Sequence, residues 1–121
     1  MNNAKCTNIT PMVWVADFQK SLNFYKTILG FEVGAELEGY AYMVRDSIAI
    51  RLLAKQEASE HAEQSCYICV NGLDKLYQEL KPKLDELPDS RVKPPLDQPY
   101  GQREFHVTDE DGLLLFFGEK I

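Results

Sequence analysis

The sequence lacks the features that mark membrane proteins and nucleic-acid-binding proteins. Its 121 residues contain no apolar run near the ~20 residues that span a bilayer, and the polar residues 1–5 lack the apolar core of a signal peptide. Basic residues are few: 13 lysines and arginines against 19 aspartates and glutamates give a net charge of -6, whereas a nucleic-acid binder needs a basic surface. We therefore expect a cytoplasmic protein that binds neither membranes nor nucleic acids.

Cysteine and histidine are scarce as well, with three and two copies. Cys66 and Cys69 form a CxxC pattern inside a β-favouring run, residues 65–70, where positions three apart point to opposite faces. They are poorly placed to share a metal or a disulfide, and we expect structural cysteines that are buried or half-buried. His61 lies in a polar segment, where we expect it to be solvated. His106 lies in a predicted strand, where we expect a structural hydrogen bond on a face that the sequence does not identify.

The same order of elements is predicted twice along the chain. In the first half, Asp17 is a typical helix N-cap and Gly30 a typical helix stop. The predicted elements of this half are a strand at 9–16, a helix of about three and a half turns at 18–29, and strands at 31–37, 40–45 and 47–53. After a polar linker, residues 55–64, the second half predicts a strand at 65–70, a helix that follows Asn71-Gly72 and is limited by Pro82 and Pro88, a weaker strand at 91–96, and a closing β-hairpin.

These elements predict an α+β fold made of two βαβββ modules, residues 8–54 and 65–121, in a single domain of residues 1–121. One helix covers only one face of a four-stranded sheet. The other face must therefore meet a partner or line a cavity. In the turn of the closing hairpin we expect Asp109, Glu110 and Asp111 to be solvated rather than catalytic.

Short motifs along the whole chain point to a family. They are VWVAD (residues 13–17), SLNFY (21–25), LGF (29–31) and TDEDG (108–112). They resemble the vicinal oxygen chelate superfamily, which includes glyoxalase I, extradiol dioxygenases, fosfomycin resistance proteins and bleomycin resistance proteins. Three further segments resemble the bleomycin resistance branch: YAYMVRD (40–46), VNGLDKLY (70–77) and QPYGQREF (98–105).

Metal enzymes of this superfamily take one His, Gln or Glu ligand from each of four strand positions. The resemblance places these positions at Thr10, Arg51, Ser65 and Phe116. Arginine cannot be deprotonated and phenylalanine has no donor atom. The sequence therefore predicts no metal site, no cofactor and no metal-dependent reaction.

The same register implies an aromatic cleft. Alternation along the strands from Thr10 and Ser65 would place Met12, Trp14, Tyr67 and Cys69 on its surface. In bleomycin resistance proteins, aromatic side chains hold the flat tail of the drug in a dimer groove, and the matching positions are Tyr40 and Tyr100. The predicted ligand-binding residues are Trp14, Tyr40, Tyr42, Arg51, Tyr67, Tyr100 and Phe116.

A homodimer is implied by the same resemblance. In bleomycin resistance proteins the N-terminal strand crosses to the other subunit at a proline hinge, and Pro11 stands at that position. Exchange of this kind is a low-cost route to a symmetric dimer.

Three functional hypotheses follow. The first is a metal-independent binding protein that sequesters a planar or aromatic molecule, such as an antibiotic of the bleomycin kind, and so serves antibiotic resistance. The second is an enzyme of the superfamily, a lyase or dioxygenase with displaced metal ligands. The third is a non-catalytic interaction or sensing module.

Overall fold

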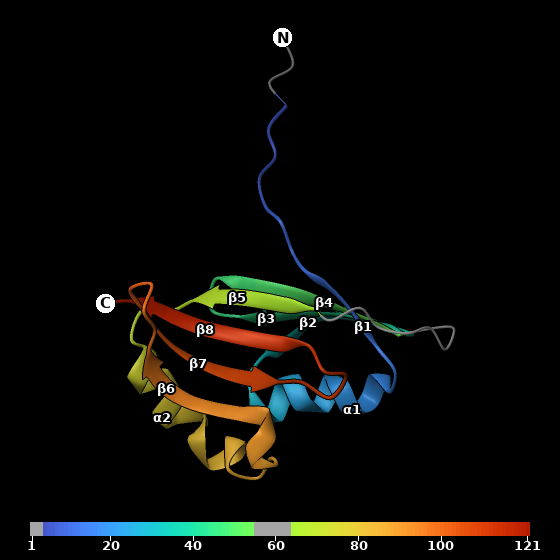
Figure 1. The fold of residues 1–121 in the computed structure, drawn as a ribbon. Coiled ribbons are helices and arrows are strands. Elements are labelled where there is room, and N and C mark those ends of the chain that lie inside the picture. Colours follow the sequence, from blue (N-terminus) through green and yellow to red (C-terminus); the bar gives the residue numbers. More distant parts are fainter. Residues whose placement is uncertain (1–3, 55–63) are drawn as a thin grey trace.

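Two four-stranded sheets organise the computed structural model, which describes residues 4–54 and 64–121 (Figure 1). The first sheet has the strand order β1-β4-β3-β2 and the second the order β5-β8-β7-β6. The equivalent order in the two halves confirms the predicted pair of βαβββ modules. The predicted linker, together with His61, lies outside the described residues except for Gln64.

In the first sheet, β1 pairs in parallel with β4, and the remaining neighbours are antiparallel. Strand β1 is shorter than predicted because it begins only after Pro11, whose missing N–H cannot serve a ladder. The segment before β1 extends away from both sheets (Figure 1). The elements of this module are β1 (Met12–Val15), α1 (Phe18–Asn23), η1 (Phe24–Ile28), β2 (Glu32–Leu37), β3 (Tyr40–Arg45) and β4 (Ile48–Ala54).

The first helix starts at its predicted cap but is not a single α-helix. The carboxylate of Asp17 accepts a hydrogen bond from the Lys20 N–H at 3.1 Å, which satisfies a donor of the first turn. From Phe24 onwards the chain forms a π-helical turn, η1, instead of the predicted continuous α-helix. Consecutive residues Phe24 and Tyr25 are both buried at this wider turn. Gly30, with φ of 74°, ends the helical segment as predicted.

The second module contains β5 (Ser65–Cys69), α2 (Leu73–Leu84), η2 (Asp89–Arg91), β6 (Val92–Asp97), β7 (Gln102–Thr108) and β8 (Leu114–Lys120). Pro82 lies inside α2, and the helix ends two residues after it, at Leu84. The register of β6 shifts between Lys93 and Leu96, where Pro94-Pro95 interrupts the ladder. Within the described residues, no helix is long and apolar enough to span a bilayer.

The start of α2 is capped from a distant strand. Gly72 has a left-handed conformation, φ 87°, and offers no side chain to cap the helix. The Glu119 carboxylate of β8 accepts hydrogen bonds from the N–H groups of Gly72 at 2.9 Å and Leu73 at 3.0 Å. These bonds lower the pKa of Glu119 below its ordinary value, and they couple the first turn of α2 to the last strand.

One hydrophobic core joins the two modules. Alternate residues of the strands face the helices and are buried, as the pairs Val13 and Val15 in β1 and Phe105 and Val107 in β7 illustrate. Helix α1 contacts β4, whereas α2 contacts β6, β7, β8 and η1. The helices of residues 4–54 and 64–121 leave the opposite faces of both sheets uncovered.

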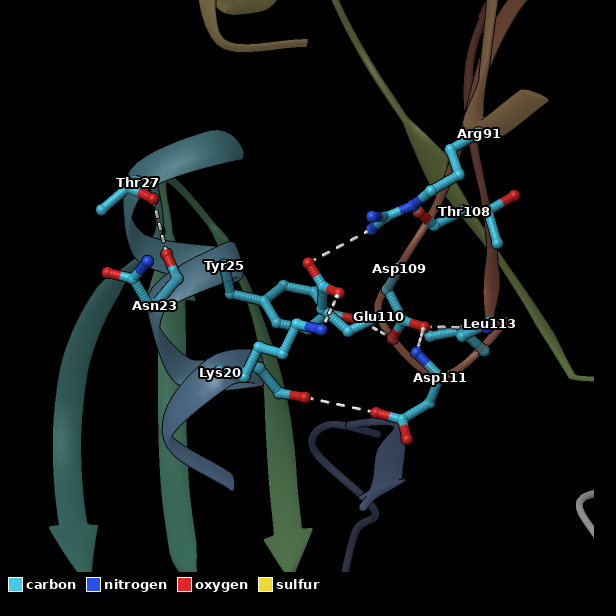
Figure 2. A network of polar contacts seen from close by, with 11 residues as sticks. Lys20, Asn23, Tyr25, Thr27, Arg91, Thr108, Asp109, Glu110, Asp111 and Leu113 are labelled. Carbon is cyan, nitrogen blue, oxygen red and sulfur yellow. Dashed lines mark hydrogen bonds and ion pairs between the residues drawn. The ribbon is translucent and has the colours of Figure 1, made fainter. Parts of the chain in front are cut away.

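A dense polar network fastens the turn between β7 and β8 to the first helix (Figure 2). The Tyr25 hydroxyl donates to Asp109 at 2.7 Å, and the other oxygen of Asp109 accepts from the N–H groups of Asp111 and Leu113. Asp111 in turn accepts from the Ser21 hydroxyl at 3.2 Å. Asp109 is 3% exposed. The expectation of solvated turn carboxylates is therefore wrong, since this turn connects the two modules.

Glu110 completes the network with two ion pairs. Its carboxylate lies 3.4 Å from the Lys20 ammonium of α1 and 3.5 Å from the Arg91 guanidinium of η2 (Figure 2). The turn thus joins the continuous helical segment α1–η1 of the first module to η2 of the second. It fixes the two sheets relative to each other and so positions their uncovered faces.

Candidate functional site

The uncovered faces of the two sheets carry most of the predicted ligand-binding residues. In β1, Val13 and Val15 are buried in the core, whereas Met12 and Trp14 are 55% and 48% exposed. We call the uncovered face of each sheet its open face, which is defined by the side chains that point away from the core. The predicted alternation of β1 is therefore present in the structure.

Arg51 lies at the centre of the first open face. It pairs with Met12 on one side and with Tyr42 on the other. Its Nε donates to the Thr10 hydroxyl at 2.9 Å, and its Nη1 donates to the Tyr40 hydroxyl. The guanidinium carbon lies 4.7 Å from the centre of the Tyr42 ring, a cation–π contact. The structure thus brings together three predicted site residues, Arg51, Tyr40 and Tyr42.

On the second open face, strand register places Tyr67, Phe116 and His106 in one row. The rings of Tyr67 and Phe116 are stacked, with centroids 5.8 Å apart, and the His106 ring lies 4.3 Å from Phe116. The Tyr67 phenol extends over Gly118, where an added Cβ would lie 1.9 Å from the Tyr67 Oη. Only a glycine at this position leaves room for the phenol.

The Tyr67 phenol reaches a buried carboxylate, that of Glu104. This residue is 1% exposed although it lies on the open face. Its Oε2 accepts from the Tyr67 hydroxyl at 2.8 Å, and its Oε1 accepts from the Tyr100 hydroxyl at 2.7 Å. The His106 Nε2 lies 2.9 Å from the same Oε1. His106 therefore occupies the open face and forms the structural hydrogen bond expected of it.

This network shifts the pKa of its members. Burial alone would raise the pKa of Glu104, but the hydrogen bonds from His106, Tyr100 and Tyr67 outweigh it and hold the pKa below its ordinary value. Burial and the bond to Glu104 raise the pKa of Tyr67 to about 12. The hydrogen bond to Glu104 also raises the pKa of Tyr100. The ionised carboxylate and the neutral phenols therefore stabilise one another.

A hollow of about 360 Å³ lies where the two sheets meet. Its lining includes Pro11 from the N-terminal segment, Tyr42 from the first sheet, and Tyr67 and Cys69 from the second. Small-molecule pockets commonly occupy roughly 300–1,000 Å³. The hollow is thus large enough for a small planar group and brings predicted residues of both modules together.

Other predicted residues lie apart. Tyr40 and Tyr100 belong to different modules, and in the part of the chain that the structure describes no hydrogen bond or ring contact joins them. Each instead bonds to a charged residue of its own module, Arg51 or Glu104. Tyr100 is 60% exposed. A sandwich built from both tyrosines stays a prediction that requires a second copy of the chain.

The four positions that correspond to metal ligands in the superfamily do not fit a divalent metal. The Arg51 guanidinium occupies the first open face and donates to Thr10, so a fixed positive charge stands where a cation would bind. Phe116 occupies the matching position of the second sheet and stacks on Tyr67. Among residues 4–54 and 64–121, no three His, Cys, Asp or Glu side chains are grouped as a metal would require.

Sequence reasoning did not identify Glu104 as part of the site. The signal was its position: Glu104 is two residues before His106 in a strand, so the two share a face. The cysteine prediction was partly wrong. Cys66 is half-buried and packs against the core, but Cys6 and Cys69 are exposed, and β5 directs Cys69 to the open face.

Comparison with known proteins agrees with this arrangement. The model of the Glyoxalase/Bleomycin resistance protein/Dioxygenase superfamily matches residues 9–117. A bleomycin resistance protein of Geobacillus stearothermophilus is 29% identical over 128 residues, covering 92% of this chain and 95% of the relative.

Two solved structures have the same fold. A bleomycin-binding protein complexed with bleomycin is 22% identical, with a TM-score of 0.81, and the match covers 96% of this chain and 100% of that one. A bleomycin-binding protein from Streptomyces verticillus, complexed with copper(II)-bleomycin, is 25% identical, with a TM-score of 0.76 and coverage of 95% and 97%. This chain belongs to the Glyoxalase/Bleomycin resistance protein/Dioxygenase superfamily.

Proposed function

We propose that this protein binds a planar aromatic small molecule of the bleomycin kind, without a metal, in a groove formed by two copies of the chain. The observation that carries the proposal is the pair of open faces, each lined with aromatic side chains that the single chain leaves accessible. Trp14 and Tyr67 are 48% and 46% exposed. Relatives that match nearly the whole chain are bleomycin resistance proteins, which supports this ligand class.

The second copy would complete the groove. Exposed apolar side chains on an ordered sheet mark a surface that favours a partner, and such side chains are Met12 and Trp14 on the first open face and Tyr67 on the second. The segment before β1 extends away from its own chain (Figure 1), where it is free to reach a second subunit. Pro11 would then be the hinge of the exchange. In such a dimer, Tyr40 and Tyr100 from different subunits would hold the ligand between them.

Titration with bleomycin tests the proposal, with the fluorescence of Trp14, the single tryptophan of the chain, as the signal. We expect saturable quenching with a Kd in the micromolar range, since stacking on an aromatic pair contributes on the order of 1 kcal/mol beyond area burial. No change up to millimolar bleomycin would remove the drug from the proposal.

Two substitutions at one position separate ring stacking from hydrogen bonding. Tyr100→Ala removes the ring and should weaken binding about tenfold, because both stacking and buried area are lost. Tyr100→Phe keeps the ring and removes only the hydroxyl that donates to Glu104, so its Kd should stay within about threefold of the wild-type value. Equal affinities for all three proteins would mean that Tyr100 does not contact the ligand.

A further inference from the structure

We infer that Arg51 is an anchor for an anionic group of the ligand, so that the groove selects planar aromatic molecules that carry a carboxylate or phosphate. This inference rests on the planar-ligand groove of the proposed function and narrows it, because an anionic group at Arg51 favours planar molecules other than a cationic drug such as bleomycin. It starts from the way in which the four arginines of the chain are paired.

Three arginines have carboxylate partners. Arg45 lies 2.7 Å from Glu79, Arg103 lies 3.0 Å from both Asp74 and Asp97, and Arg91 lies 3.5 Å from Glu110. Arg51 differs. Within residues 4–54 and 64–121, the structure shows no acidic side chain within ion-pair distance of its guanidinium.

Among the described residues, Arg51 contacts neutral groups. The Thr10 and Tyr40 hydroxyls accept from its Nε and Nη1, and its guanidinium carbon lies over the Tyr42 ring. A guanidinium has five N–H donors. The hydroxyls of Thr10 and Tyr40 use two of them. The other three N–H donors, one on Nη1 and two on Nη2, have no acceptor among the described residues. They form a fork of the kind that binds carboxylates and phosphates.

Burial makes the lack of a counter-charge among residues 4–54 and 64–121 significant. Arg51 is half-buried, and removing a cation from water is unfavourable unless an opposite charge lies nearby. Contact with the Tyr42 ring and two hydroxyls offsets only part of this cost. A bound anion would offset more of it, and the held side chain would lose little freedom on binding.

The buried carboxylate of the second open face is not available to Arg51 of a partner copy. Glu104 is the buried carboxylate of the second open face, but three donors from its own chain already occupy its oxygens. It is 1% exposed, so a partner's guanidinium could reach it only after this network opened. An anionic ligand requires no such rearrangement.

Matched naphthalene probes test the inference on the full chain. Naphthalene-2-carboxylate and 2-naphthyl phosphate carry the two candidate anions, and naphthalene-2-carboxamide has the same ring without the charge. We expect the wild-type protein to bind one or both anions at least tenfold more tightly than the carboxamide, as a charge-assisted hydrogen bond would give. The stronger of the two anions identifies the preferred group.

Variants then assign the preference to Arg51. Arg51→Gln should lose the anion preference, with a loss of affinity for the anions at least tenfold greater than that for the carboxamide. Arg51→Lys keeps the charge but loses the fork, so it should retain a weaker preference. Arg103→Gln is the matched control, because it removes the same charge from a side chain that pairs with Asp74 of α2, and it should keep the wild-type preference. Thermal unfolding of each variant confirms that it is folded.

The outcomes distinguish this inference from the proposed function. Equal wild-type affinity for the anions and the carboxamide overturns the anionic anchor and leaves the planar-ligand groove intact. An unchanged preference in folded Arg51→Gln or Arg51→Lys, or its loss in Arg103→Gln, also overturns the assignment. Failure of every naphthalene probe and of bleomycin to bind overturns both proposals.

Discussion

Glu104 shows how a single charged residue can be kept inside an otherwise aromatic surface. A buried carboxylate is strongly unfavourable unless hydrogen bonds satisfy it. Here two phenols and an imidazole do so, and the three rings are thereby fixed in position around it. The carboxylate thus orients Tyr67 and Tyr100, two predicted ligand-binding residues, without being exposed itself.

The pKa of Tyr67 gives the first prediction. The fold favours the neutral phenol, so this residue contributes stability that is present below its ordinary pKa of 10.0 and is lost as pH rises through about 12. In Glu104→Gln the pKa of Tyr67 should fall but remain above 10.0, because burial, the larger cause, persists. Phenolate absorbance measures the shift, with Tyr67→Phe to assign the titration step. An unchanged step in Glu104→Gln would show that the two groups do not interact.

Gly118 gives a second prediction at this scale. Gly118→Ala places a methyl group 1.9 Å from the Tyr67 Oη, so the phenol must leave Glu104. We expect a loss of about 1–3 kcal/mol in the free energy of unfolding, measured by chemical denaturation. In a Tyr67→Ala background the same substitution should cost less than about 1 kcal/mol. Equal costs in the two backgrounds would contradict the clash.

Among the elements, the turn between β7 and β8 joins the modules through polar contacts. Its three carboxylates bond to α1, η1 and η2, although sequence alone suggested a solvated turn. Aspartate and glycine residues in a hairpin turn are usually solvated. In this turn the carboxylates bond instead to side chains of the neighbouring helix. The partners lie far away in sequence, Tyr25 being 84 positions from Asp109. Local patterns therefore could not predict the contact.

Substitution of Asp109 tests this role. Asp109→Ala removes the acceptor for the Tyr25 hydroxyl and two backbone N–H groups, so unfolding free energy should fall by about 3 kcal/mol. Asp109→Asn keeps an acceptor oxygen and should cost less. Tyr25→Phe removes one donor and should cost about 1 kcal/mol. Denaturant titration measures all three, and similar stability of Asp109→Ala and wild type would show that the turn does not join the modules.

The same carboxylate predicts a dependence of stability on pH. Burial raises the pKa of Asp109 above its ordinary value of 3.8. The folded chain therefore binds this proton more tightly than the unfolded chain, and this contribution to stability is lost as pH rises from 3.8 through the raised value. Asp109→Asn should remove the contribution. A wild-type and variant pair whose stability difference does not change over this range would contradict the prediction.

At the scale of the whole molecule, the open faces predict association. Light scattering at micromolar concentration should give twice the mass of one chain. Trp14→Glu places a charge on the first open face and should favour the monomer, whereas Gln78→Glu, on the exposed surface of α2, should leave the mass unchanged. A monomeric wild-type mass would contradict the two-copy groove.

The sequence predicted the architecture well because its signals were local. Strand alternation, the Asp17 cap and the Gly30 stop each depend on neighbouring residues, and together they gave the two modules and the exposed side of β1. The site was harder to predict. Glu104 bonds to Tyr67, 37 positions away, and this bond requires the space that Gly118 leaves for the phenol. No periodic pattern in the sequence predicts such a contact.

The position of β8 also has a consequence for synthesis on the ribosome. Strand β8 lies between β5 and β7, and its Glu119 caps the distant helix α2. Both β5 and α2 are translated before β8. Strand β5 therefore lacks its neighbour, and α2 lacks its Glu119 cap, until β8 has been made. The second module should therefore form in one step after residue 119 has emerged. Truncated products that end before β8 would expose the edge of β5 and the ring of Phe105, which makes them substrates for chaperones and proteases.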